Sequence, residues 1–182
     1  MKKKYLLALL ILVFVVTGCN GMMNTPTKRT EEYLGKFQTH DKEVISELQD
    51  VINKDTALKN DDHRKKYGDL MKKQYQNLSY KIKDETVNGD SATVTVEIEV
   101  FDYYTAMDKA TRYISEHQEE FQKEDKTLDD IKVMTYKLEQ MEKSKDKVKY
   151  TIEFHLTKKD DKWTLNDIPN ATLQKIQGMY QV

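Results

Sequence analysis

The sequence has few of the residues that mark covalent or phosphate-binding scaffolds: one cysteine, two prolines and six glycines in 182 residues. A single cysteine, Cys19, excludes an internal disulfide framework. The glycines are scattered, so no loop of the kind that cradles a phosphate is present. Only one long apolar run occurs, over residues 6–16, which excludes a protein with several membrane spans.

Arginine and clustered histidine are also scarce. The three arginines are Arg29, Arg64 and Arg112, and the lysines form no concentrated basic face, so nucleic-acid binding is disfavoured. The four histidines are far apart and show no metal-ligand spacing. No serine lies between the flanking glycines of a nucleophile elbow. We therefore expect no metal, no cofactor and no catalytic residue.

The amino terminus has the pattern of an export signal. Three lysines at positions 2–4 precede the apolar run, which at 11 residues is much shorter than the ~20 needed to span a bilayer. We therefore predict a signal peptide over residues 1–18, with a short N-terminal membrane anchor as the alternative.

The end of this run carries a more specific motif. Val16, Thr17 and Gly18 followed by Cys19 resemble the bacterial lipobox, in which small residues precede an obligatory cysteine. The resemblance implies cleavage after Gly18, diacylglyceryl transfer to the Cys19 thiol and stable anchoring by two acyl chains. It also explains why an exported chain keeps a single cysteine. Residues 19–182 then hold 27 basic and 31 acidic residues, a net charge of −4.

Helical periodicity follows a short tether over residues 19–29. We expect a helix from Thr30, as its cap, to about Asn53, with Gly35 or the His40–Asp41 region able to divide it in two. A second helix should begin at Asp61 or Asp62. A third should occupy about 103–123, and a short one about 170–180.

Between these helices the apolar residues alternate, which predicts strands. Residues 78–82 and 92–100 form a hairpin around Asn88 and Gly89. A plain two-residue turn there would put Tyr80 opposite Glu97, mixing apolar and polar faces. We therefore predict that Tyr80 pairs with Ile98 and Ile82 with Val96. That register requires a three-residue loop over 88–90 or an equivalent bulge near Val87.

Three further strands are expected after the third helix. Alternation over 134–138 predicts the first, 148–156 the second and 163–165 the last. A two-residue turn at Asp160 and Asp161 would place Leu165 opposite Leu156. The chain is therefore predicted to be α+β.

This order of elements resembles the nuclear transport factor 2-like fold of small lipoproteins from Gram-positive bacteria. The matching stretches are 78–82, 87–96 and 162–165, and the resemblance spans about 30–168. It implies a strongly curved antiparallel sheet wrapped around helices as a cone, in one domain over 30–182. The fold serves isomerases, dehydratases and non-catalytic binding proteins, so it does not select a function.

Eleven tyrosines suggest where a ligand could bind. The candidate pocket residues are Tyr80, Tyr136, Tyr150, Trp163 and His117, with Tyr113 nearby. Aromatic rings with hydroxyl tips could line a pocket inside the cone, or they could pack its core. Asp102 and His117 are the nearest acid–base candidates. His117 lies on the apolar stripe of its expected helix, where a hydrogen-bonded core histidine is the alternative. His155 alternates with the apolar residues of its strand, so we expect it at the surface.

These observations predict a lipoprotein of the cell membrane, anchored through Cys19 on the extracytoplasmic face. Its predicted role is a non-catalytic binding or interaction module with an envelope protein as partner. The alternatives are a pocket for a small apolar or aromatic ligand and, third, an enzyme of the same fold. A cone filled by its own side chains would favour protein interaction, and an open one a ligand.

Overall fold

The computed structural model of the chain describes residues 24–181. The predicted signal peptide, the cleavage site after Gly18 and the lipidated Cys19 lie outside the described residues. Within 24–181, no helix combines the length and apolar character needed to cross a membrane.

Three helices open the fold: α1 (Pro26–Gln38), α2 (Lys42–Lys54) and α3 (Asp61–Asn77). Helix α1 begins four residues before Thr30, because the Thr25 side chain accepts the Lys28 N–H and Pro26 fits the first turn. The Thr30 hydroxyl is buried and donates to the Pro26 carbonyl, so the predicted cap is wrong and residues 26–29 belong to the helix rather than to the tether. The break between α1 and α2 occurs at His40, which has a φ of 54°.

The first two strands, β1 (Ser79–Asn88) and β2 (Ser91–Phe101), confirm the predicted register. Tyr80 pairs with Ile98 and Ile82 with Val96. The turn itself has two residues, Gly89 and Asp90, and the extra residue is a bulge between Ile82 and Asp84. The bulge keeps the apolar side chains on one face, as the alternation requires.

Strands β3 (Lys147–Lys159) and β4 (Lys162–Leu165) complete an antiparallel sheet in the order β1-β2-β3-β4. Leu156 pairs with Leu165 as predicted. The connecting turn consists of Asp160 and Asp161, both with positive φ, which matches the twist of the strands.

The predicted strand over 134–138 is wrong. Residues Asp130–Lys143 form helix α5, which is joined to α4 (Tyr103–Glu116) by a turn of 3₁₀ helix, η1 (Gln118–Phe121), and a loop. Asp129 caps α5 by accepting the N–H groups of Ile131 and Lys132, and Leu138 and Met141, three residues apart, are its buried residues. The short helix α6 (Asn170–Ile176) follows β4.

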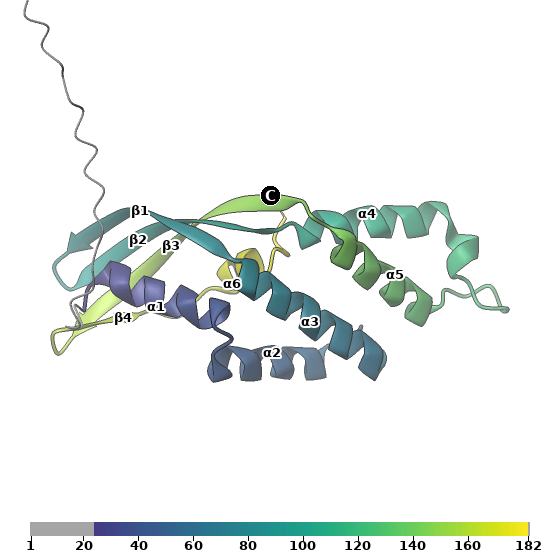
Figure 1. Cartoon of the computed structure of the whole chain (residues 1–182), viewed down its shortest axis with the longest axis horizontal. Helices are drawn as coiled ribbons and strands as arrows, with labels where there is room; N and C mark the ends of the chain where they lie inside the picture. Colours follow the sequence, from purple (N-terminus) through teal and green to yellow (C-terminus); the bar gives the residue numbers. More distant parts are fainter. Residues whose placement is uncertain (1–23, 182) are drawn as a thin grey trace, which may run out of the picture.

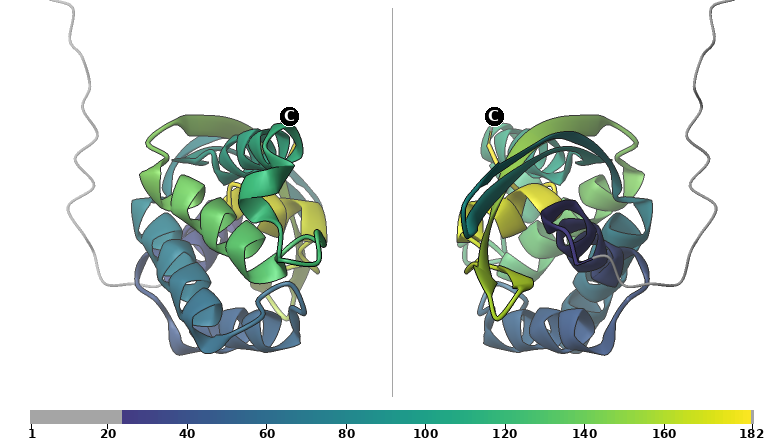
Figure 2. Two further views of the ribbon diagram at one scale, coloured as in Figure 1. Left: turned by 90° about the vertical axis from the view of Figure 1, so that its right-hand side faces the viewer. Right: turned by 90° about the vertical axis from the view of Figure 1, so that its left-hand side faces the viewer.

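The sheet curves around α1, with α3 beside it (Figure 2). Side chains fill the space between them: the ring of Tyr33 meets Phe154 edge-on at 5.8 Å, and Phe37 meets Tyr75 at 5.1 Å. The inner face of β2 is fully buried. The fold is therefore α+β with a filled interior. The cone-shaped fold stays a prediction, since one of the strands on which the resemblance depended is a helix.

Helices α4 and α5 form an antiparallel hairpin that extends past the end of the sheet, away from the start of α1 (Figure 1). The hairpin is inserted in the sequence between β2 and β3. Its second helix, α5, also packs against α3. An ion pair at 2.9 Å between Lys66 and Glu142 joins α3 to α5.

Candidate functional site

The structure separates the five predicted pocket residues into two groups. Tyr80, Tyr150 and Trp163 belong to the sheet. Tyr80 and Tyr150 lie in one row across it, because both pair with Ile98. Tyr150 and Trp163 are buried in the main core, and Tyr80 packs half-buried against it. These three side chains form part of the core rather than the wall of an open pocket.

The hydroxyl of Tyr150 has a structural partner. It donates a hydrogen bond of 2.8 Å to the carbonyl of Tyr180, whose ring meets that of Tyr150 edge-on. Burial raises the pKa of Tyr150 to about 12, so the hydroxyl stays protonated and continues to donate. The bond ties the carboxyl-terminal segment to the sheet.

The other two residues, His117 and Tyr136, lie on the helical hairpin with Tyr113. The rings of Tyr113 and His117 stack at 4.0 Å, and those of Tyr113 and Tyr136 at 5.2 Å. Phe121 is buried and meets Tyr113 and Tyr136 edge-on. This cluster connects α4, η1 and α5 at a distance from the sheet core, so aromatic packing holds the hairpin closed.

His117 is the C-cap residue of α4. Its Nδ1 lies 3.0 Å from the Tyr113 carbonyl, and its backbone ends α4. Asp102 caps the other end of α4 by accepting the N–H of Thr105. The two acid–base candidates therefore lie at opposite ends of one helix. His155 is exposed, as predicted, and its Nδ1 lies 3.1 Å from the Thr93 hydroxyl.

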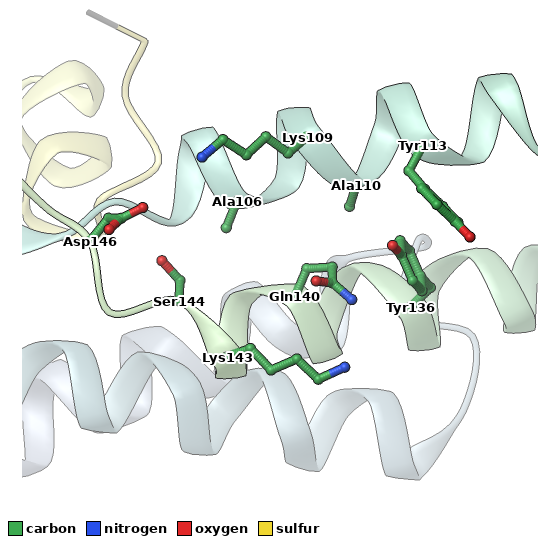
Figure 3. Close-up of a pocket in the computed structure, with 9 residues that line it drawn as sticks. All are labelled: Ala106, Lys109, Ala110, Tyr113, Tyr136, Gln140, Lys143, Ser144 and Asp146. Carbon is green, nitrogen blue, oxygen red and sulfur yellow. The ribbon is translucent and has the colours of Figure 1, made fainter.

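A groove of about 350 Å³ runs between α4 and α5 (Figure 3). Its floor is formed by two alanines of α4, and the stacked rings of Tyr113 and Tyr136 close one end. We call it the hairpin groove. It is lined by Ala106, Lys109, Ala110, Tyr113, Tyr136, Gln140, Lys143, Ser144 and Asp146.

The residues that line the hairpin groove could bind a small molecule through van der Waals contacts and hydrogen bonds. Lys109 and Lys143 supply ammonium groups, and Gln140 and Ser144 supply neutral donors and acceptors. Desolvation and the nearby Glu120 carboxylate raise the pKa of Tyr113, whose hydroxyl donates to Glu120 at 3.3 Å. A protonated phenol, the amide of Gln140 and two lysines can orient an anionic or aromatic group, and the lysines outnumber the one carboxylate of the lining, Asp146.

A second hollow, of about 340 Å³, lies on the other side of Tyr136, near the free end of the hairpin. Phe121, Ile131 and Tyr136 supply its apolar surface, and the carboxylates of Glu120 and Glu139 and the ammonium of Lys132 border it. We call it the tip hollow. Leu128 and Ile131 are 47% and 51% exposed, although both are large apolar residues. The sequence analysis did not select Ile131, because this residue lies between the helix expected over about 103–123 and the strand expected over 134–138.

Helix α3 carries a further residue that the sequence analysis did not select. His63 is 4% exposed, its Nε2 lies 2.9 Å from the Thr135 hydroxyl on α5, and its Nδ1 has no hydrogen-bond partner among the described residues. Burial lowers its pKa, while Asp62 acts in the opposite direction. Among residues 24–181, no group of three histidine, cysteine or carboxylate side chains is placed to hold a metal ion.

No protein-family model matches the chain, and no curated protein sequence matches it. Among solved structures, it is similar to a "putative lipoprotein (ycdA)" from Bacillus subtilis subsp. subtilis str. 168, with a TM-score of 0.42 and 16% sequence identity. The similarity covers 83% of this chain and 46% of that one, so this chain spans less than half of that protein's length.

Proposed function

We propose that the protein is a lipoprotein anchored through Cys19 at the extracytoplasmic face of the cell membrane, and that its folded domain is a non-catalytic interaction module. The hairpin of α4 and α5 is the part that contacts another envelope protein. The observation that carries the proposal is the position of this hairpin: it extends beyond the sheet and bears exposed Leu128 and Ile131 beside the tip hollow.

The filled interior of the sheet supports protein interaction over a ligand pocket within the cone. Tyr33, Phe37 and Tyr75 occupy the space between α1, α3 and the sheet. The nuclear transport factor 2-like assignment is part of the same proposal. The curved sheet around α1 supports it, and helix α5 in place of a strand counts against it.

An anchor at Cys19 would leave the α4–α5 hairpin pointing away from the membrane. Asn24 donates to the carbonyl of Asp161 at 3.3 Å, so the start of the described chain lies against the turn between β3 and β4. Cys19 precedes Asn24 by five positions in the sequence, and five residue steps span at most about 18 Å. The β3–β4 turn would then face the membrane. The free end of the hairpin lies at the opposite end of the long axis (Figure 1).

Chemical cross-linking in intact host cells tests the proposal. The double variant Leu128→Ser with Ile131→Ser removes the exposed apolar residues of the hairpin. Its matched control is Val51→Ser with Val87→Ser, because both valines are 50% exposed but lie on α2 and β1. We expect a cross-linked complex that the hairpin variant loses and the control keeps. Equal loss or retention in both variants would contradict the proposed role.

A small-ligand function is the second candidate, and the hairpin groove favours it. Two stacked tyrosines and two lysines line a space of about 350 Å³, within the range of small-molecule sites. Native mass spectrometry of the protein purified from its own host distinguishes the two candidates. A small molecule at stoichiometric occupancy, lost on Tyr136→Ala, would favour the ligand function.

A further inference from the structure

The acidic excess of the chain is concentrated at the free end of the α4–α5 hairpin. Residues 116–130, which we call the acidic tip, contain seven carboxylates and two lysines, a net charge of −5. Residues 19–182 together carry −4, so the rest of that sequence carries +1. The net charge of the mature chain therefore belongs to one small region.

Internal contacts account for only some of these carboxylates. Asp129 caps α5, and Asp130 forms an ion pair with Lys59 at 3.3 Å. Glu116, Glu119 and Glu124 are exposed and form no ion pair within residues 24–181. Like charges gathered without counterions repel one another, and an oppositely charged partner would relieve that repulsion.

Apolar surface lies directly beside this charge. Two of the large apolar side chains that are about half exposed, Leu128 and Ile131, belong to this end of the hairpin. The tip hollow places Ile131 next to the rings of Phe121 and Tyr136 and borders them with the carboxylates of Glu120 and Glu139. Lys132 also borders it, and its ammonium group donates to the Gln122 carbonyl at 3.4 Å, so the rim keeps a net negative charge. Single exposed apolar residues are ordinary on protein surfaces, whereas an apolar hollow within a charged rim is typical of an interaction site.

We propose that the acidic tip and the tip hollow bind a polypeptide segment of another protein in which lysine or arginine residues flank a large apolar side chain. The apolar side chain occupies the tip hollow, and the cations lie over the free carboxylates. This inference rests on the proposed function and names the chemistry of its partner. An anionic membrane surface would repel the same carboxylates, and this end of the hairpin lies opposite the β3–β4 turn, where the described chain begins (Figure 1).

The acidic tip and the tip hollow affect different steps of binding, association and dissociation respectively. The net charge of the tip attracts a basic segment over a distance of about one Debye length and raises its rate of association. Burial of the apolar side chain against Phe121 and Tyr136 supplies contact energy at the centre and slows dissociation. Binding should therefore weaken with salt mainly through slower association.

Site-specific photo-cross-linking in the host, with the full-length protein, tests the inference. A photoreactive residue replaces Ile131, and in the control it replaces Val51, which is equally exposed on α2. We expect an adduct at position 131 that position 51 does not give. Mass spectrometry of the adduct should identify a segment with several lysines or arginines around an apolar residue.

Neutralising the free carboxylates tests the electrostatic part. With the photoreactive residue kept at position 131, the variant Glu116→Gln, Glu119→Gln, Glu124→Gln should lower the adduct yield roughly threefold or more, since exposed pairs contribute little singly but add together. The control Glu47→Gln, Asp50→Asn, Glu153→Gln removes the same charge from exposed residues outside the tip and should change the yield little.

The outcomes separate this inference from the proposed function. An adduct with a protein segment that lacks lysine and arginine, or a yield that both triple variants change equally, overturns the inference and leaves an interaction module. An adduct with a second copy of this chain or with lipid overturns the inference as well. Equal labelling at positions 131 and 51, or no adduct at 131, overturns both proposals.

Discussion

Gly178 lies where three distant parts of the chain meet. Its carbonyl accepts the N–H of Tyr104, and the side chain of Gln74, fully buried on α3, bonds to the carbonyls of Phe101 and Gln177 and accepts the Phe101 N–H. Gly178 has a φ of +67°, and a Cβ there would overlap Phe101 O and Gln74 Nε2. Only glycine both adopts this positive φ without strain and leaves the space that a Cβ would occupy to Phe101 and Gln74.

Gly178→Ala should therefore lower the free energy of unfolding by roughly 2–4 kcal/mol, through left-handed backbone strain and displacement of the Gln74 hydrogen bonds. Gly35→Ala is the control: Gly35 lies inside α1 with open space around its Cβ position, and alanine should add roughly 0.5–1 kcal/mol. Urea unfolding followed by circular dichroism measures both. A Gly178→Ala protein as stable as the wild type would contradict this account of the junction.

His63 should make stability depend on pH. Its pKa is lowered by burial, so below about pH 6.5 the unfolded chain binds a proton that the folded chain does not. The free energy of unfolding should fall as the pH drops from 6.5 through the folded-state pKa, by at most about 1.4 kcal/mol per pH unit. Urea unfolding between pH 7.5 and 5 measures the slope.

The variant His63→Gln removes this proton and should flatten the slope in that window. The control is His155→Gln, which removes an exposed imidazole on β3. Because His63 bonds to Thr135 on α5, the protection factors of amides in α5, which correct for the slower intrinsic exchange in acid, should also fall at the lower pH in the wild type. Parallel slopes in the wild type and His63→Gln would refute the assignment.

At the scale of elements, the bulge in β1 allows a paired test of strand register. Deleting Lys83 removes the extra residue while Ile82 still pairs with Val96, so the protein should unfold at nearly the wild-type urea concentration. Deleting Lys81 makes Tyr80 and Ile82 adjacent in the strand. Because adjacent residues of a strand point to opposite faces, one of the two side chains must then leave the apolar face. That deletion should cost roughly 1.5–3 kcal/mol, the burial energy of one large side chain.

Urea unfolding of the two deletion variants, with the wild type alongside, gives the comparison. Each variant loses one exposed lysine, so the difference between them reports register and not charge. If the Lys83 deletion costs as much as the Lys81 deletion, the extra residue does not act as a bulge.

Helix α5 shows why one element was assigned wrongly from sequence. Met134, Tyr136 and Leu138 alternate with polar or smaller residues, and three residues of alternation fit a strand. The helical signal was longer: Asp129 is a good cap, and Ile131, Met134, Leu138 and Met141 recur at three and four residues. The Asp129 cap and the continuous helical spacing of apolar residues over 131–141 together indicate a helix, and they outweigh three residues of alternation.

At the scale of the whole molecule, the β3–β4 turn and the free end of the α4–α5 hairpin lie at opposite ends of the long axis (Figure 1), and the proposed anchor would place the turn at the membrane. In vesicles that carry the lipidated full-length protein, a fluorophore on Lys162→Cys, next to the β3–β4 turn, should be quenched strongly by headgroup-attached quenchers. The same fluorophore on Lys123→Cys, in the acidic tip, should be quenched weakly. The proposed lipidation converts the Cys19 thiol, the single cysteine of the sequence, to a thioether, which leaves the introduced cysteine as the available thiol.

The same labels on a Cys19→Ala background provide the control, because this variant should incorporate no fatty-acid label and should show no quenching at either position. Equal quenching at positions 162 and 123 in the lipidated protein would contradict the outward orientation of the hairpin. Fatty-acid labelling of the Cys19→Ala variant at the wild-type level would refute the lipoprotein assignment.

Sequence alone determined the α+β class, the register of β1 with β2 and the turn between β3 and β4, because alternation and turn chemistry act over a few neighbouring residues. It also placed Tyr150 and Trp163 on the buried face of the sheet. Only the tertiary structure decided that Tyr136 joins Tyr113 and His117 on a hairpin away from Tyr80. It likewise gathered Ile131, Phe121 and the acidic tip at one end. Those neighbours depend on how α5 packs against α3 and α4, a choice made by long-range contacts that a local pattern does not contain.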